Sequence, residues 1–538
     1  MKYLEPESED GNVEYKFTLS EITEDRARLE ELASQMRYRL YEGNGEAFYY
    51  IGVEDDGTPT GLDDSQIEAS LNAITEVARI AGAKIKTLRR ETGNSGMILE
   101  LFVRREKDPD ELPVDIRVAS VGNVDAGKSS LIGVLLKGNL DDGRGSARSQ
   151  VFRYLHELES GRTSAVSTTV LGFDDDGKIV NHDKVHTPTD IELLERSIKT
   201  ITFHDLAGHE KYLKTTIFGL TGLTPDFAML IVAANQGVLQ MTREHLGLVA
   251  SLKIPLFIAL TKTDLAPETK RKQTLAELKK LLKIPGVSKV PMMIKSDEDV
   301  VVAALNIKSR SVVPIFQVSS VTGAGIEELK QFLQLLPASK YDKELAKNEF
   351  RAYIDDIFQV SGVGTVVAAM VYEGSVKNQQ NVLLGPLDDG SFREVRIKSI
   401  HYKRVVTNGV VAGQNATFAL HNVKRDLVRK GMVLLAKSKK TTHAVFKFDA
   451  EIYVLYHSTT IREGYTPVIH CRSIRQSAQM LKISDSVLRT GDRAKVTFQF
   501  MYRPEVIHVG QRVVFREGRT KGLGIVTAIH PEPNGNGK

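Results

Sequence analysis

The sequence predicts a multidomain protein in which a small α+β domain, an α/β domain and two β-barrels follow one another. Three observations support this prediction. Apolar strands alternate with helical segments over residues 112–337, which is typical of a mostly parallel sheet with helices on both faces. Helical periodicity ends after residue 348, and alternating strands separated by turns follow. The chain has 538 residues, which is enough for about three or four domains.

The predicted α+β domain covers residues 1–109. Apolar residues at helical spacing predict one helix over Thr23–Leu40, and an acidic start predicts a second over Asp64–Ala81. Residues 46–53 are apolar and β-prone, and residues 84–104 are expected to form a hairpin. We find no catalytic constellation in this domain and interpret it as an interaction module.

The α/β domain, residues 112–337, begins with an apolar strand that ends at Gly122, and Gly127-Lys128-Ser129 then opens an amphipathic helix. The spacing Gly-x-x-x-x-Gly-Lys-Ser between a strand and a helix is the pattern of a phosphate-binding loop. Glycines let backbone N–H groups turn toward a phosphate, and the helix N-terminus adds its dipole. Lys128 is expected to reach the β- and γ-phosphates, and the Ser129 hydroxyl to coordinate Mg²⁺. The alternative is a chance glycine turn before a helix.

A second strand, residues 197–205, ends in Asp205-Leu-Ala-Gly208-His209. Asp205 can hold Mg²⁺ through a water, and the Gly208 amide can meet the γ-phosphate, so this loop would sense whether that phosphate is present. His209 directly after the glycine can orient or polarise the attacking water. A purely structural histidine is the alternative.

Two further strands end in loops that can select the base. Asp264 offers a carboxylate to the N1 and N2 donors of guanine, which adenine lacks. Lys262 can lie along the base, and the backbone after residue 318 can meet guanine O6. All these loops follow the carboxyl ends of strands, where open parallel sheets bind ligands. The sequence therefore predicts that GTP or GDP is bound by Gly122, Asn123, Val124, Asp125, Ala126, Gly127, Lys128, Ser129, Ser130, Gly208, Thr261, Lys262, Asp264, Ser319, Ser320 and Val321.

The long polar stretch 141–196 separates the phosphate loop from Asp205. A hydroxyl in it could complete the coordination of Mg²⁺ and order the stretch only while the γ-phosphate is present. The residues alone do not choose among the candidates, which are Thr163, Ser164, Thr168 and Thr169.

Two successive β-barrels are predicted over residues 345–438 and 442–531, after a charged linker. Residues 339–538 carry 31 Lys and Arg against 18 Asp and Glu, a net +13, whereas residues 1–338 carry 41 against 50, a net −9. A basic excess confined to one half suggests a polyanionic partner for that half. A solvated lysine-rich surface is the alternative.

The remaining composition points to a reducing, cytoplasmic location. The single cysteine, Cys471, excludes an internal disulfide framework and a cysteine-based zinc site. The sequence contains no run of eighteen apolar residues, so it predicts no membrane span. The acidic N-terminus does not have the pattern of a secretion signal.

The whole chain resembles translational GTPases of the elongation factor Tu and elongation factor 1-alpha class, and within it the GTP-binding protein 1 and 2 family. Residues 122–130 are similar to the phosphate loop of the class, and Asp205-x-x-Gly208-His209 to its switch II. Residues 365–434 and 464–524 resemble its second and third domains. The acidic N-terminal module, with Ile51–Gly57, resembles the extra domain of the GTP-binding protein 1 branch.

The resemblance implies a GTPase that hydrolyses GTP to GDP and phosphate, with His209 as the catalytic residue. Gly161-Arg-Thr163-Ser164 stands near the class pattern Arg-Gly-Ile-Thr, so the implied Mg²⁺ residues are Ser129, Thr163 and Asp205, with Ser164 in reserve. Thr261 replaces the usual asparagine of the base-binding motif. We expect this change to weaken nucleotide affinity without altering the choice of base.

The implied partners are aminoacyl-tRNA or another RNA and the ribosome, bound by a monomer. Two other functions stay open. A ribosome-rescue or RNA-surveillance switch of the same architecture would bind a protein decoy or RNA-decay machinery. A GTPase subunit regulating a metabolic enzyme is the third possibility, and the basic excess in the barrels argues against it.

Overall fold

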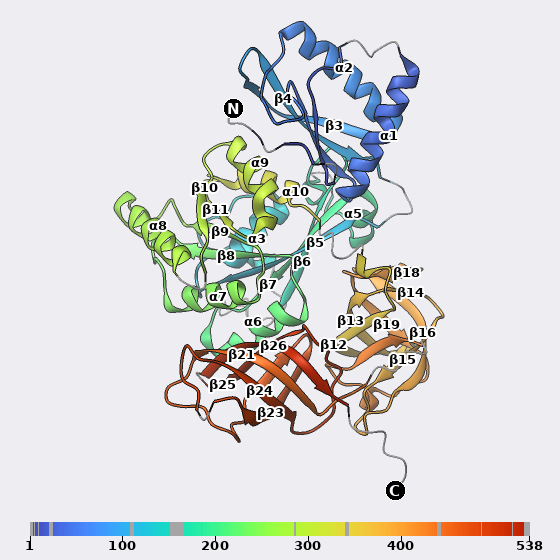
Figure 1. Cartoon of the computed structure of the whole chain (residues 1–538), viewed down its shortest axis with the longest axis vertical. Coiled ribbons are helices and arrows are strands. Elements are labelled where there is room, and N and C mark those ends of the chain that lie inside the picture. Colours follow the sequence, from blue (N-terminus) through green and yellow to red (C-terminus); the bar gives the residue numbers. More distant parts are fainter. Residues whose placement is uncertain are drawn as a thin grey trace.

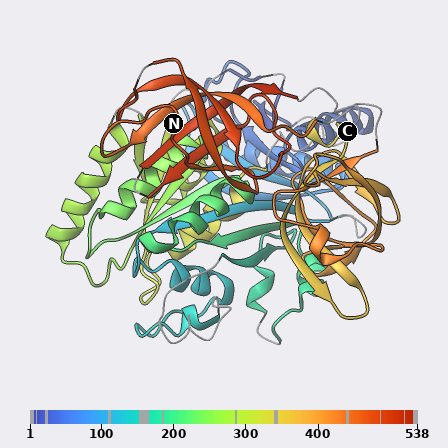
Figure 2. The same ribbon diagram turned by 90° about the horizontal axis from the view of Figure 1, so that it is seen from below.

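The structure, a computed structural model, describes residues 4, 6–8, 10–20, 25–107, 112–150, 166–183, 186–284, 287–338, 344–437, 443–485, 487–518 and 520–531. An N-terminal α+β unit lies at one end of the molecule, a central sheet with its helices in the middle, and two barrels at the other end (Figure 1). Seen from below, the two barrels lie next to one another against the central sheet (Figure 2). No helix among the described residues is long and apolar enough to cross a membrane.

The central sheet has seven strands in the order β10-β11-β9-β8-β5-β7-β6. Six of them run parallel, and β6 is antiparallel to β7. Its inner strands read as continuous apolar runs because helices cover both faces. Helices α3, α9 and α10 pack on one face, and α6, α7 and α8 on the other. The elements are β5 (Val114–Gly122), α3 (Lys128–Lys137), β6 (Ser167–Phe173), α5 (Asp190–Arg196), β7 (Lys199–Asp205), α6 (Leu213–Gly222), β8 (Phe227–Ala233), α7 (Gln240–Ser251), β9 (Leu256–Thr261), α8 (Glu268–Lys283), β10 (Val290–Met293), α9 (Asp297–Asn306), β11 (Val312–Gln317) and α10 (Ile326–Leu335).

The N-terminal unit is a four-stranded sheet in the order β1-β2-β4-β3 with two helices on one face. Asp25 caps the first helix, and Asp63 with Gln66 forms a capping box at the start of the second. The opposite face of the sheet, with Phe48 and Phe102, joins the core on the α9–α10 side of the central sheet. The elements are β1 (Val13–Lys16), α1 (Arg26–Glu42), β2 (Glu46–Ile51), α2 (Asp64–Ala81), β3 (Ala83–Thr92) and β4 (Met97–Arg105).

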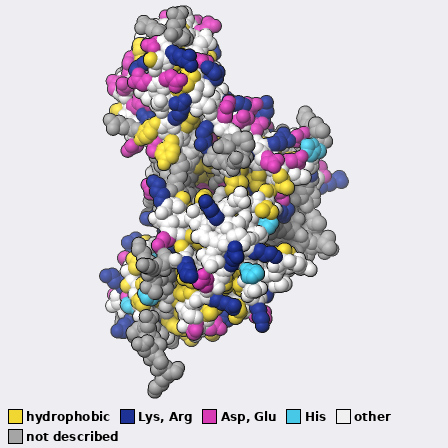
Figure 3. Space-filling model, turned by 90° about the vertical axis from the view of Figure 1, so that its right-hand side faces the viewer, with side chains coloured by type: hydrophobic (Ala, Val, Ile, Leu, Met, Phe, Trp, Pro, Cys, Tyr) yellow, Lys and Arg dark blue, Asp and Glu magenta, His cyan; other side chains and the backbone are white. Residues whose placement is uncertain are grey.

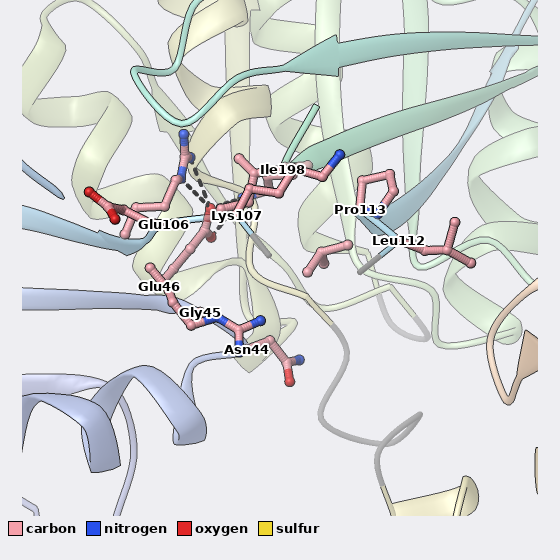
Figure 4. Close-up of a pocket in the computed structure, with 12 residues that line it drawn as sticks. Asn44, Gly45, Glu46, Glu106, Lys107, Leu112, Pro113 and Ile198 are labelled. Carbon is pink, nitrogen blue, oxygen red and sulfur yellow. Dashed lines mark hydrogen bonds and ion pairs between the residues drawn. The ribbon is translucent and has the colours of Figure 1, made fainter. Parts of the chain in front are cut away.

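A buried ion-pair network fixes this unit to the central sheet. Lys199, the first residue of β7, lies 2.8 Å from a carboxylate oxygen of Glu46 on β2, and Arg104 of β4 lies 2.9 Å from the other. Lys199 also donates to the Gln334 carbonyl at 2.6 Å. Figure 4 shows the interactions converging on the carboxylate of Glu46. Burial lowers the pKa of Lys199 to about 8, against the opposing effect of Glu46. The pairs therefore join three strands from two sheets.

Each barrel is closed by six strands. In the first, β15-β20-β12-β13-β19-β16 closes because β15 also pairs with β16; in the second, the order is β21-β24-β23-β22-β25-β26. Arg429 of the first barrel lies 2.9 Å from the buried Glu505 of the second. The strands are β12 (Arg351–Val360), β13 (Gly364–Glu373), β14 (Ser375–Lys377), β15 (Asn381–Gly385), β16 (Arg393–Tyr402), β17 (Val405–Thr407), β18 (Gly409–Val411), β19 (Asn415–Leu420), β20 (Val433–Ala436), β21 (Lys447–Tyr456), β22 (Val468–Cys471), β23 (Ile474–Ile483), β24 (Arg493–Phe500), β25 (Arg512–Glu517) and β26 (Thr520–His530).

The predicted fold class is confirmed, with differences in detail. Part of the polar stretch before Asp205 forms the strand β6, which pairs with β7 along its whole length. Several other strands were not predicted individually, among them β1, β10, β12, β15, β23 and β26. The first helix begins at Arg26, where Asp25 accepts hydrogen bonds from the amides of residues 27 and 28, and Thr23, its predicted start, lies outside the described residues.

Candidate nucleotide-binding site

The phosphate loop connects β5 to α3 through residues 123–127. Gly127 sits before the helix with φ +86°, a left-handed conformation that favours glycine, and it provides no side-chain cap. The first amides of α3 are therefore not capped by a side chain and point along the helix axis toward the loop. This arrangement suits a phosphate, which accepts hydrogen bonds and carries negative charge at the positive end of the helix dipole.

Lys128 is buried beside this loop. Its ammonium donates to the Asn123 carbonyl at 2.8 Å and to the Gly122 carbonyl at 3.2 Å. Among the described residues, no carboxylate lies within ion-pair distance of it. Burial lowers its pKa, and Asp205 and Asp125 act in the opposite direction. A buried ammonium held only by carbonyls fits the negatively charged phosphates of a nucleotide.

Ser129 and Asp205 meet at the next position along the loop. The Ser129 hydroxyl donates to one carboxylate oxygen of Asp205 at 2.6 Å, and Ser120 donates to the other at 2.7 Å. Both Ser129 and Asp205 are buried. Hydroxyl and carboxylate oxygens are the ligands that Mg²⁺ prefers, together with water and phosphate oxygens. The residues present therefore fit a magnesium ion at the end of the phosphate loop.

The loop after β7 lies directly against the phosphate loop at Gly208. A Cβ atom built on Gly208 would lie 2.5 Å from the Lys128 ammonium and 2.6 Å from the Gly122 carbonyl oxygen, which leaves no room for a side chain. His209 follows on the surface, where its Nδ1 accepts from the Lys211 amide at 3.1 Å. Residues Gly208 and His209 line one hollow of about 90 Å³ together with Lys128.

The loops predicted to hold the base also meet. The Ser319 hydroxyl donates to Asp264 at 2.6 Å and accepts from the amides of Val321 and Thr322 at 3.2 and 3.1 Å. Ser320 is tied to the same region, since its carbonyl accepts from the Asp141 amide at 2.8 Å. Asp264 therefore has a fixed position, as selective hydrogen bonding to a base requires.

Thr261 connects the base loops to the phosphate loop. Its hydroxyl donates to the Ala126 carbonyl at 2.6 Å and lies 3.3 Å from the Val232 carbonyl. Lys262, next to it, has φ +56° and lines the same hollow as His209. Where the class motif has asparagine, the threonine hydroxyl therefore braces the backbone of the phosphate loop.

The structure thus brings the predicted residues that it describes to one edge of the central sheet. Thr163 and the alternative Mg²⁺ ligand Ser164 lie outside the described residues. Thr168 and Thr169 lie in β6, where Thr168 Oγ1 is 3.2 Å from His204 Nδ1. Sequence reasoning missed Ser120, which holds Asp205, and Arg148, which lines the hollow at His209. No sequence pattern singles out either residue.

Family models match most of the chain after its N-terminal unit. The elongation factor Tu GTP binding domain matches residues 115–339, elongation factor Tu domain 2 matches residues 364–435, and the elongation factor Tu C-terminal domain matches residues 441–530. The matched segments cover the central sheet and both barrels in the order in which they occur.

Relatives match nearly the full chain. GTP-binding protein 1 of Xenopus laevis is 45% identical over 527 residues, 98% of this chain and 80% of that protein. GTP-binding protein 2 of Homo sapiens is 46% identical over 537 residues, 98% of this chain and 88% of that protein. Elongation factor 1-alpha of Methanocella arvoryzae is 27% identical over 453 residues, 78% of this chain and 98% of that protein.

Two solved structures share the fold at 20% sequence identity. A bacterial selenocysteine-specific elongation factor superposes with a TM-score of 0.56 over 78% of this chain, and this chain spans 58% of that one. The elongation factor SelB of Methanococcus maripaludis, in complex with the GTP analogue GppNHp, gives 0.54 over 78% of this chain and 80% of its own.

Proposed function

Because the chain belongs to the elongation factor Tu family of GTPases and binds GTP or GDP with Mg²⁺, we propose that it is a cytoplasmic translation factor. In this proposal the GTP-bound protein carries aminoacyl-tRNA to the ribosome, and hydrolysis of GTP to GDP and phosphate releases it. The expected assignments of individual site residues are part of the same proposal.

The chain's own groups divide the work of hydrolysis. Lys128 and the amides at the start of α3 bind the β- and γ-phosphates, while the Gly208 amide contacts the γ-phosphate. His209 orients the attacking water from the rim of the hollow. Ser129 and Asp205 would hold Mg²⁺, which neutralises charge on the phosphate oxygens when bound. Asp264 selects guanine.

The observation that carries the proposal is the position of α6, the helix that follows Gly208 and His209. At its end, the Gly222 carbonyl accepts from the Tyr372 hydroxyl of the first barrel at 3.2 Å. Thr221 in the same turn lies 3.3 Å from the carbonyl of Arg472 in the second barrel. A shift of the loop that contacts the γ-phosphate would therefore reach both barrels through one helix.

The charge of the barrels supports an RNA partner. The basic half of the sequence, residues 339–538, with its net charge of +13, contains both barrels. Figure 3 shows acidic and basic side chains mixed over the N-terminal unit, with dark blue ones prominent toward the barrels. Lysine and arginine surfaces bind nucleic-acid phosphates by releasing counterions.

The first experiment measures the dissociation constant for aminoacyl-tRNA and for deacylated tRNA, with GppNHp or GDP bound, at about 0.05 and 0.2 M salt. Tight, salt-dependent binding of charged tRNA in the GppNHp state alone is the expected result. Equal, weak binding in all states would refute delivery. That result would favour the surveillance function, and the next experiment would then search for proteins that bind the N-terminal unit.

The second experiment tests the assignment of His209. We expect ribosome-stimulated GTP hydrolysis to fall by about a hundredfold or more in His209→Ala, because one positioned general base or orienting group contributes about that much. GTP affinity should stay unchanged. His443→Ala, an exposed histidine between the barrels, is the matched control. Unchanged stimulated turnover in His209→Ala would rule out its catalytic role.

A further inference from the structure

A second, larger cavity lies on the opposite edge of the central sheet. Its volume is about 910 Å³, and its walls come from the N-terminal unit, the central sheet and both barrels. Asp226 and Phe227 at the start of β8 and Pro255 before β9 line it, whereas the nucleotide loops follow the carboxyl ends of the strands. The two linings share no residue. The cavity is therefore separate from the nucleotide site.

Positive side chains dominate the ionisable groups that line this cavity. The carboxylates are Glu42, Asp226 and Glu373. Asp226 lies 2.8 Å from Arg117, and Glu373 pairs with Arg351. The cations and the one histidine are Lys253, Lys308, Arg310, Arg351, Arg472, His508 and Arg512.

Three of the arginines have no carboxylate partner among the described residues. Arg512 donates to the Leu252 carbonyl, and the Arg472 guanidinium lies 4.0 Å from the centre of the Tyr372 ring. Arg310 is exposed at the end of a short helical turn after α9. Arginine is the side chain best suited to hydrogen-bond a phosphate with two parallel donors.

The cations are close enough to act on one another. Burial lowers the pKa of Arg512, and Arg310 and Arg472 lower it further. Burial also lowers the pKa of His508 to about 4, with Arg351 and Arg472 acting in the same direction. His508 is therefore neutral at pH 7. Mutual repulsion of this kind is relieved when an anion enters.

We propose that this central cavity binds a small phosphorylated anion carrying several negative charges, held by Arg310, Arg472 and Arg512 from the central sheet and the second barrel. The cavity has the size of a ligand pocket for a nucleotide-sized molecule. Leu220 and Thr221 of α6 line the same cavity. A bound anion therefore contacts the central sheet, the second barrel and the helix between the nucleotide loop and the barrels.

The test titrates tripolyphosphate into the full chain by calorimetry. The protein is first saturated with GDP at constant free Mg²⁺, so that the phosphate loop is occupied, and ionic strength is held at about 0.15 M to separate specific binding from screening. We expect one saturable site per chain. Affinity should fall by about tenfold or more in Arg472→Gln and in Arg310→Gln, each of which removes charge-assisted hydrogen bonds.

Arg310→Gln is a surface change and keeps the test valid if Arg472→Gln, which loses the contact with Tyr372, folds poorly. Arg489→Gln removes the same charge from an exposed position of the second barrel outside the cavity and should bind as the wild type does. Equal affinity in all three variants, or heat without saturation, would overturn the proposal.

A parallel titration with ATP distinguishes the source of the phosphate groups. Tighter binding of ATP than of tripolyphosphate would assign the site to a nucleotide. Equal affinity for the two would assign it to a phosphate chain alone, and both results support the proposal. The proposal would be overturned in favour of an RNA contact if tripolyphosphate gave no saturable heat and a short single-stranded RNA bound the wild type but bound Arg472→Gln and Arg310→Gln more weakly.

Discussion

Breaking one buried ion pair should loosen the first barrel from the central sheet. Lys403, in the turn between β16 and β17, reaches Asp115 at the start of β5, with 2.7 Å between the ammonium and the carboxylate. Thr200 and Thr202 of β7 donate to the same carboxylate oxygen at 2.9 and 2.6 Å. Side-chain exposure is only 11% for Lys403 and 9% for Asp115. Removing either charge therefore leaves the other largely out of water.

The two single substitutions should have unequal costs. Asp115→Asn leaves the Lys403 ammonium with neutral oxygens only, and an unpaired buried charge costs about 3–5 kcal/mol. Lys403→Met leaves Asp115 with two hydroxyl donors, so we expect a smaller loss of about 1.5–3 kcal/mol, the range for one hydrogen bond to a charged group. The double variant should lose less than Asp115→Asn alone, because neither charge then stays buried without its partner.

Urea unfolding at pH 7 provides the measurement, with the free energy of the first unfolding transition compared across the four proteins, since a chain of several units need not unfold in one step. Arg404→Met, which removes an exposed pair with Asp190, is the control and should change stability by less than about 1 kcal/mol. Equal costs for the two single variants, or additive costs in the double variant, would refute the reasoning.

Three further predictions concern single residues. Asp264→Asn should weaken GTP binding by about a hundredfold and favour xanthosine triphosphate, since an amide can donate to the xanthine 2-oxygen; competition binding measures both. Ser129→Ala should raise the Mg²⁺ concentration needed for half-maximal GTP binding by about tenfold or more, because one metal ligand is lost. Burial raises the pKa of Asp355 to about 6 from 3.8, so its ionisation destabilises the fold as pH rises through that interval. Asp355→Asn should therefore be more stable than the wild type by about 2–3 kcal/mol above pH 6, with no difference near pH 4, as measured by unfolding across pH.

Each of these has an outcome that contradicts it. Unchanged preference for GTP over xanthosine triphosphate would remove Asp264 from the base site. An unaltered Mg²⁺ requirement in Ser129→Ala would place the metal elsewhere. A pH-independent stability difference for Asp355→Asn would show that the carboxyl does not titrate in that interval. Ser34→Ala, at an exposed position of α1, and Asp356→Asn are the controls for the last two.

The elements that local pattern alone determines were predicted well. The helix α2 has the predicted bounds, Asp64–Ala81, because a capping box starts it and a glycine ends it. The hairpin predicted over residues 84–104 is also present, formed by β3 and β4. The strand β6 was missed because it alternates weakly and exists through its pairing with β7. Long-range pairing of this kind leaves little trace in a single sequence.

In the nucleotide site, too, the residues that a local pattern defines could be predicted and those that depend on long-range packing could not. The glycines and the Lys128-Ser129 pair could be recognised because their chemistry needs adjacent positions. The bond from Thr261 to Ala126 joins residues 135 apart, and Lys199 meets Glu46 across 153 residues. Such contacts depend on how distant parts of the chain pack. The sequence around Thr261 or Lys199 contains no pattern that predicts its partner.

The buried pairs at the start of β7 have a consequence for how the protein moves. The strand that ends in Asp205 begins at Lys199, which holds Glu46 of the N-terminal unit. A fluorescent pair with one dye on α2 and the other on α8 should therefore keep its separation when GTP is exchanged for GDP. Any protein bound to the N-terminal unit would therefore keep one orientation relative to the nucleotide-binding sheet in both nucleotide states, whatever the position of the barrels.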